Sequence, residues 1–237
     1  MEKIRKEKSR EMNHTIETVY FWIAELVPLV STLFSLIYGL VNFFKKGTPL
    51  FLQSLTMAMA SYFLSVTYHL CQTFTSEVIL DSFTPAYLGR IGFFMFFITA
   101  SYGQLDRIVD DRSPQMRPAR LIAFIAPICA ALLYIPNYFA ISPYFTKISY
   151  ALIWIPAVVS VYFSLKHAII PDLDFGFIKA IKPYNVCVLL LSFSELLSLT
   201  AWDYFNSRWV AVTSIAFGIL CICTMIAAKK GVKKWTI

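Results

Sequence analysis

The chain has 237 residues, of which 58% are hydrophobic and only 15% are charged. Soluble globular domains are closer to half apolar and a quarter charged, so this composition excludes an ordinary soluble protein. The formal net charge is +7 at pH 7, but the lysines and arginines lie almost entirely between and beside apolar runs. That distribution indicates membrane topology rather than binding to nucleic acid.

Apolar runs of about 20 residues recur along the chain, and a helix of that length crosses a hydrocarbon core of about 30 Å. We therefore predict an all-α fold, a polytopic integral membrane protein built as a seven-transmembrane helical bundle. The predicted spans are Tyr20–Phe44, Leu50–Phe74, Ala86–Leu105, Leu121–Phe139, Ile148–Ile170, Pro183–Tyr204 and Trp209–Ala228. The connections between them are too short to hold a soluble domain.

The basic residues predict the orientation of these spans. Thirteen lysines and arginines lie on the side of the C-terminus, whereas the other side, apart from the N-terminal tail, has only Lys147 and Arg208. Because basic loops stay in the cytoplasm, we predict a multi-pass protein of the cell membrane with its N-terminus outside and its C-terminus cytoplasmic. Residues 1–18 then form an extracytoplasmic tail, 19–230 the transmembrane domain, and 231–237 a cytoplasmic basic tail.

The N-terminal tail itself opposes this orientation. It carries five basic residues on the side that should be poor in them: Lys3, Arg5, Lys6, Lys8 and Arg10. We nevertheless favour an outside N-terminus, since moving the tail inside requires one span fewer or a re-entrant first segment.

A carboxylate, Glu195, lies near the centre of the apolar run Val186–Tyr204. An ionisable group at that depth costs about 3 kcal/mol on insertion scales, so it usually faces a cavity or a partner. In the predicted orientation, other polar residues of the spans also fall in the outer half of the membrane. Together they predict an outward-facing polar pocket that binds a small ligand. Its predicted residues are Glu25, Ser65, Tyr68, His69, Arg90, Glu195, Trp202 and Asp203.

The charged residues of this pocket should pair with one another. We expect Arg90 to pair with Glu25 or Glu195, because an unpaired charge in a span is too costly to keep. The alternative to a ligand pocket is a network of ion pairs that only holds helices together. Interhelical polar contacts average less than about 1 kcal/mol in membranes, so stability alone is a weak reason to retain them.

The segment S-V-T-Y-H, Ser65–His69, resembles the Ser-x-x-x-His element of the seven-span metal-dependent hydrolases that include alkaline ceramidases and adiponectin-receptor-like proteins. The resemblance implies an intramembrane hydrolase with zinc held by histidines of the second and seventh spans. The last predicted span here contains no histidine, and the chain has only His14, His69 and His167. A three-histidine site cannot be assembled from these. We therefore predict no metal, no cofactor and no catalytic residue, and an enzyme using His69 and Glu195 as acid and base is the least favoured function.

The seven spans, the aromatic-Leu-Gly element Tyr87–Gly89, and the positions of Pro127 and Asn137 resemble the seven-transmembrane sensor domains of some bacterial histidine kinases. This resemblance implies a receptor-like protein that binds a small-molecule ligand. We expect no kinase or cyclase domain after Ile237, so the signal would leave through a membrane or cytoplasmic partner. The alternative is a transporter or channel with Glu195 as the proton or cation site. Besides these partners we expect only the lipid bilayer, and no nucleic acid.

Overall fold

The computed structural model describes the backbone of most of the chain. The described residues are 2–75, 84–110, 112–140, 144–171, 177–204 and 207–235. Within these ranges the structure does not describe the side chains of some residues, which are 2–15, 104, 137, 140, 144–146, 177–178, 201–204, 207 and 234–235.

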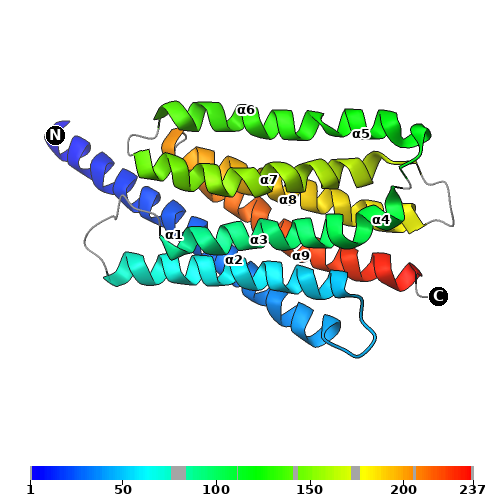
Figure 1. Ribbon diagram of the computed structural model, residues 1–237. Coiled ribbons are helices and arrows are strands. Elements are labelled where there is room, and N and C mark those ends of the chain that lie inside the picture. The colour runs from blue at the N-terminus through cyan, green and yellow to red at the C-terminus, as the bar shows by residue number, and fades with distance from the viewer. Residues whose placement is uncertain are drawn as a thin grey trace.

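All regular secondary structure in the described residues is helical, which confirms the predicted all-α fold. The elements are α1 (Glu2–Phe43), α2 (Leu50–Thr75), α3 (Pro85–Ala100), the π-helical segment η1 (Ser101–Leu105), α4 (Asp106–Val109), the 3₁₀ turn η2 (Pro114–Met116), α5 (Arg117–Ala123), α6 (Ile125–Ala140), α7 (Tyr144–Ile169), α8 (Phe177–Tyr204) and α9 (Ser207–Trp235). The long helices lie alongside one another in an elongated bundle, and the two chain termini lie at its opposite ends (Figure 1).

Six helical stretches in the described part of the chain are long and apolar enough to cross a membrane, which makes this a multi-pass membrane protein. They are Ile16–Phe43, Leu50–Thr75, Pro114–Pro136, Lys147–Ile169, Lys179–Thr200 and Arg208–Lys233. The seventh predicted span, Ala86–Leu105, is not among them. Its regular α-helix, α3, ends at Ala100 after 16 residues and gives way to η1. Sixteen residues rise only about 24 Å, less than the hydrocarbon core of about 30 Å.

Helices extend beyond both predicted domain boundaries. Helix α1 begins at Glu2 and continues through the predicted tail to Phe43. At the other end of the chain, α9 passes residue 230 and ends at Trp235. The fourth predicted span, Leu121–Phe139, is also not one continuous helix, because Phe124 separates α5 from α6. Pro127 follows three residues later, and its ring crowds the carbonyl four residues before it, which accounts for the break.

Aromatic side chains fill the core between α2, α3 and α9. The ring of Tyr62 lies 4.5 Å from the ring of Phe217 and 5.0 Å from that of Phe93, centroid to centroid. The outer surface of the bundle is also apolar, with Val30 62% exposed and Leu64 64% exposed. Apolar exposure of this kind over long helices is typical of a surface that faces lipid.

Candidate functional site

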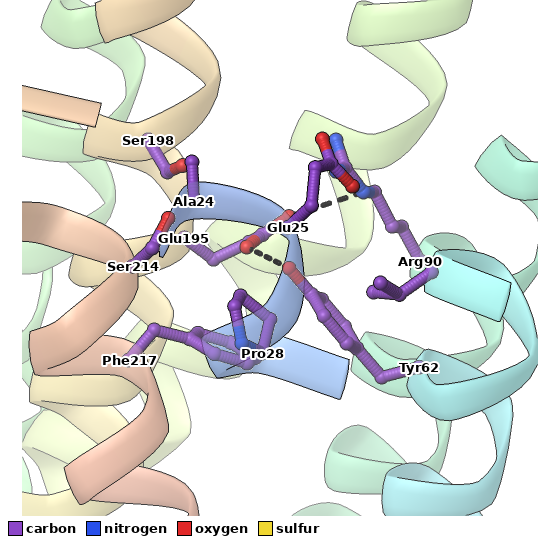
Figure 2. Close-up of a pocket in the computed structure, with 10 residues that line it drawn as sticks. Ala24, Glu25, Pro28, Tyr62, Arg90, Glu195, Ser198, Ser214 and Phe217 are labelled. Carbon is purple, nitrogen blue, oxygen red and sulfur yellow. Dashed lines mark hydrogen bonds and ion pairs between the residues drawn. The ribbon is translucent and has the colours of Figure 1, made fainter. Parts of the chain in front are cut away.

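Three helices contribute one residue each to a buried polar group that we call the central triad: Tyr62 of α2, Arg90 of α3 and Glu195 of α8. The Tyr62 hydroxyl donates a hydrogen bond of 2.5 Å to Oε2 of Glu195. Arg90 Nε lies 3.4 Å from Oε1 of the same carboxylate. Figure 2 shows Glu195 joined to both partners by dashed lines. Only 2% of Glu195 is exposed, so its charge is compensated by Arg90 and by the tyrosine hydroxyl.

A small cavity of about 20 Å³ adjoins the central triad. It is lined by Ala24, Glu25, Pro28, Tyr62, Val66, Arg90, Glu195, Ser198, Ser214 and Phe217. Pro28 lies inside α1, and a proline removes the helical hydrogen bond to the carbonyl four residues earlier. That carbonyl belongs to Ala24, which lines the same cavity. A volume of this size holds about one water molecule, so the cavity suits a water-sized polar occupant.

Two residues of the central triad that line this cavity have unused hydrogen-bonding capacity. Arg90 Nε and Glu195 Oε1 form an ion pair at 3.4 Å, yet neither atom has a hydrogen-bond partner among the described residues. A buried polar atom without a partner costs about 1–3 kcal/mol. A water-sized occupant beside Arg90 and Glu195 would satisfy both atoms at once.

A second ion pair lies between this cavity and the surface. Oε1 of Glu25 on α1 is 3.4 Å from Nε2 of His69 on α2, and the His69 side chain is 43% exposed while that of Glu25 is 7% exposed. Glu25 also lines the cavity. The Glu25–His69 pair therefore connects the central triad with the surroundings of the bundle.

The other predicted pocket residues do not join the central triad. Ser65 is buried and its hydroxyl donates a 2.6 Å hydrogen bond to the carbonyl of Ala86, which ties α2 to α3. Tyr68 is 42% exposed and lines a separate groove on the outer surface with Leu88. The side chains of Trp202 and Asp203 lie outside the described residues. Four of the eight predicted residues thus form two ion pairs, Glu25 with His69 and Arg90 with Glu195.

Tyr62 belongs to the central triad but is not among the residues predicted from the sequence. Tyr62, Ser65 and His69 have the spacing i, i+3 and i+7, which places them on one face of a helix. An aromatic ring in an apolar run gives no sign by itself that its hydroxyl meets a carboxylate from a distant helix.

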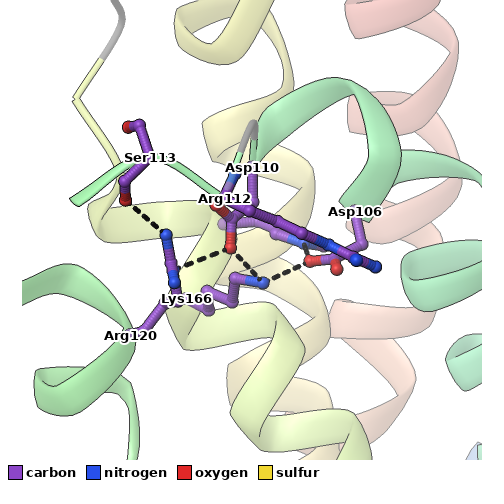
Figure 3. Close-up of polar contacts among 7 residues, drawn as sticks. Asp106, Asp110, Arg112, Ser113, Arg120 and Lys166 are labelled. Atoms are coloured by element: carbon purple, nitrogen blue, oxygen red, sulfur yellow. Dashed lines mark hydrogen bonds and ion pairs between the residues drawn. The ribbon is translucent and has the colours of Figure 1, made fainter. Parts of the chain in front are cut away.

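A second polar group lies at the other end of the helical segment α3–η1–α4, whose first helix contains Arg90. We call it the Asp106 cluster, which consists of Asp106, Asp110, Arg120, Lys166 and His167. Lys166 Nζ lies 2.5 Å from Oδ1 of Asp106 and 2.7 Å from Oδ2 of Asp110. Nε2 of His167 is 2.9 Å from Oδ1 of Asp106. Figure 3 shows Lys166 between the two carboxylates.

The loop after α4 fixes the remaining part of the Asp106 cluster. Arg120 Nε lies 3.1 Å from Oδ2 of Asp110, and its Nη2 donates to the carbonyl of Ser113. The backbone N–H of Arg112 donates to Oδ1 of Asp110 at 2.9 Å. Arg112 has φ of 62°, a left-handed conformation that a non-glycine residue adopts only when local contacts hold it. Asp110 is thereby anchored from two directions.

Charge balance sets the protonation of Asp106. Burial acts to raise the pKa of its carboxyl, but hydrogen bonds from His167 and Lys166 and the charge of Lys166 act in the opposite direction. The pKa of Asp106 consequently lies below its ordinary value. Asp106 is ionised at neutral pH and holds Lys166 in place.

No protein-family model, curated protein or solved structure matches this chain. Among the described residues, no group of three or more His, Cys, Asp or Glu side chains is arranged to hold a metal ion. In the described part of the chain, the central triad and the Asp106 cluster are two ion-pair groups, and both include residues of the segment α3–η1–α4 or of the position directly after it.

Proposed function

We propose that this protein is a receptor-like membrane sensor that binds a small ligand at the central triad and signals through a partner at the Asp106 cluster. In this proposal α3 and η1 together form a seventh span. Their 16 and five residues rise about 30 Å, which matches the hydrocarbon core. The N-terminus is outside and the C-terminus is cytoplasmic, in accordance with the basic residues.

One observation carries the proposal: both polar groups draw residues from one continuous helical segment. Arg90 belongs to α3, Asp106 is the first residue of α4, and Asp110 directly follows α4. The π-helical segment η1 lies between α3 and α4. A π-helical turn is less regular than the α-helix on either side and frequently occurs at functional sites. A shift of α3 at Arg90 is therefore expected to change the packing of α4 against Lys166.

The cavity restricts the ligand. Its volume of about 20 Å³ admits a water-sized group, such as a small ion or the charged end of a larger molecule that enters past Glu25 and His69. A negative group would compete with Glu195 for Arg90, and a positive group would compete with Arg90 for Glu195. Either ligand favours the packing in which the ion pair is open, because binding shifts the population toward the state that it fits better.

The first experiment removes the Arg90–Glu195 ion pair and measures whether the environment of α4, next to the Asp106 cluster, changes. A trifluoromethyl-phenylalanine is incorporated at position 108, where Ile108 of α4 is 50% exposed, and ¹⁹F NMR spectra are recorded in detergent micelles. Arg90→Gln is expected to shift or split the fluorine resonance. The matched control is Arg208→Gln, because Arg208 belongs to α9 and its guanidinium lies over the Tyr20 ring at 5.9 Å. An unchanged resonance in a folded Arg90→Gln protein would overturn the coupling.

A second candidate function, transport of a proton or cation, has a specific observation in its favour. Oxygen atoms surround the cavity: besides the Glu195 carboxylate, the hydroxyls of Ser198 and Ser214 and the Ala24 carbonyl lie in residues that line it. A buried carboxylate among such acceptors is typical of proton and cation sites in membranes.

Flux distinguishes this candidate from a sensor. In proteoliposomes that contain a pH-sensitive dye, a transporter should move protons or alkali cations, and Glu195→Gln should abolish the movement. The control Glu17→Gln removes an exposed carboxylate of α1 and should leave flux intact. Absence of flux in the wild-type protein, together with a fluorine shift in Arg90→Gln, favours the sensor.

A further inference from the structure

A groove of about 610 Å³ lies between α8 and α9, at the end of the bundle where α8 begins and α9 ends. Lys179 of α8 and Lys230 and Lys233 of α9 line it, and all three are exposed. None of these lysines belongs to the central triad or to the Asp106 cluster. The groove is thus a separate surface feature of the molecule.

The polarity of this groove changes along the helix axes. On α8, Lys179, Pro183 and Cys187 are spaced four residues apart and all line the groove, so they form one stripe on one helix face. On α9, Ile226 lies four residues before Lys230 on the same face and lines it too. The lysines therefore lie at the end of the bundle, and the apolar residues extend from them for about 12 Å toward its middle.

Small residues keep the groove open while the two helices stay in contact. Ala180 and Ala227 line it and occupy little of its volume. Next to them, a Cβ added to Gly231 would lie 3.1 Å from the carbonyl oxygen of Ala180. The glycine thus lets the backbones of α8 and α9 approach closely, and the larger side chains around it form the walls of the groove.

We propose that this groove binds a phospholipid with an anionic headgroup. The lysines face the phosphate and the apolar stripe faces the first part of an acyl chain, so both parts of the lipid meet surfaces of matching chemistry. Basic pockets between membrane helices bind anionic headgroups, and each basic residue near the surface strengthens binding about fivefold. In the proposed orientation the groove opens to the cytoplasmic leaflet, which is the leaflet rich in anionic lipid. This site is independent of the proposed sensing function.

Titration of lipids into the purified protein in detergent, followed by native mass spectrometry, tests the proposal. Phosphatidylglycerol should bind at least tenfold more tightly than phosphatidylcholine with the same acyl chains. Lys179→Gln combined with Lys230→Gln should abolish this preference. The matched control is Lys229→Gln: Lys229 is adjacent in sequence, but its Nζ donates to Oδ1 of Asn42 at 2.7 Å, toward α1. Equal binding of the two lipids by the wild-type protein would overturn the proposal.

Two further arms separate a lipid site from simple attraction to positive charge. Glycerol 3-phosphate has the headgroup chemistry without acyl chains and should bind at least tenfold more weakly than phosphatidylglycerol. Ala227→Phe fills the apolar part of the groove without a change of charge, and it should reduce phosphatidylglycerol binding by tenfold or more at unchanged helicity in circular dichroism. If Ala227→Phe binds the lipid as tightly as wild type, the groove is not the site.

Discussion

The hydroxyl of Tyr62 on α2 lies 2.5 Å from the Glu195 carboxylate on α8, although the two residues are 133 positions apart in the sequence. The two helices are joined there by a hydrogen bond to a charged group, which is stronger than one between neutral groups. Because Arg90 of α3 pairs with the other oxygen of the same carboxylate, Glu195 holds three helices together at one point.

Removal of the Tyr62 hydroxyl tests this junction. Tyr62→Phe keeps the ring and its packing against Phe217 but leaves Oε2 of Glu195 without its donor, so we expect a loss of about 2 kcal/mol in the free energy of unfolding. Thermal unfolding in detergent micelles measures it as a lower Tm. Tyr102→Phe is the control, since Tyr102 is 58% exposed. Equal Tm values for the two variants would contradict the role of the hydroxyl.

Lys166 should be essential for the Asp106 cluster. In Lys166→Met the partly buried carboxylate of Asp106 and the buried carboxylate of Asp110 lose their shared cation, and the loss of one partner from a buried ion pair costs about 3 kcal/mol. Chemical unfolding monitored by circular dichroism should show this loss. Addition of Asp106→Asn to Lys166→Met should restore part of the stability by removing one of the two negative charges. A double variant less stable than Lys166→Met would refute the explanation.

Stability should fall in acid because of Asp106. The pKa of this carboxyl is lower in the folded protein than in the unfolded chain, so its ionised form stabilises the fold at every pH above the unfolded value of about 4. That contribution is lost as the pH falls below about 4 and through the lower folded pKa. Unfolding measured between pH 6 and pH 3 should therefore be less pH-dependent in Asp106→Asn than in wild type. Parallel profiles would exclude this carboxyl as a source of the dependence.

Two glycines of the segment α3–η1 should respond oppositely to alanine. A Cβ at Gly89 would lie 2.6 Å from the backbone oxygen of Ser61, whereas a Cβ at Gly103 meets nothing within 4 Å. Gly89→Ala must push α2 and α3 apart, at a cost of about 1–3 kcal/mol. Gly103→Ala should be neutral or stabilising, by up to about 1 kcal/mol, because alanine is the better helix former. Thermal unfolding should give a lower Tm for Gly89→Ala than for Gly103→Ala, and equal Tm values would contradict the close approach of α2 and α3 at Gly89.

The charged residues of the central triad could be recognised from the sequence because the membrane penalises them. Glu195 and Arg90 stand out in apolar runs, and the cost of an unpaired charge predicts that they have partners. Tyr62 could not be recognised in this way, since a tyrosine is common in membrane helices. The Asp106 cluster was missed for a similar reason: Lys166 and Arg120 lie near a membrane surface, where basic residues are explained by topology alone.

The hydrophobic pattern and the distribution of charge by themselves determined that this is an all-helical membrane protein, and approximately where its helices lie. Those properties depend on local sequence and on the lipid around the chain. Only the tertiary structure decided that Arg90 pairs with Glu195 and that Tyr68 faces away from the central triad. The rotation of each helix and its choice of neighbours depend on packing between residues far apart in sequence. The π-helical segment η1 between α3 and α4 is likewise known only from the tertiary structure, because no residue pattern in the chain predicts it.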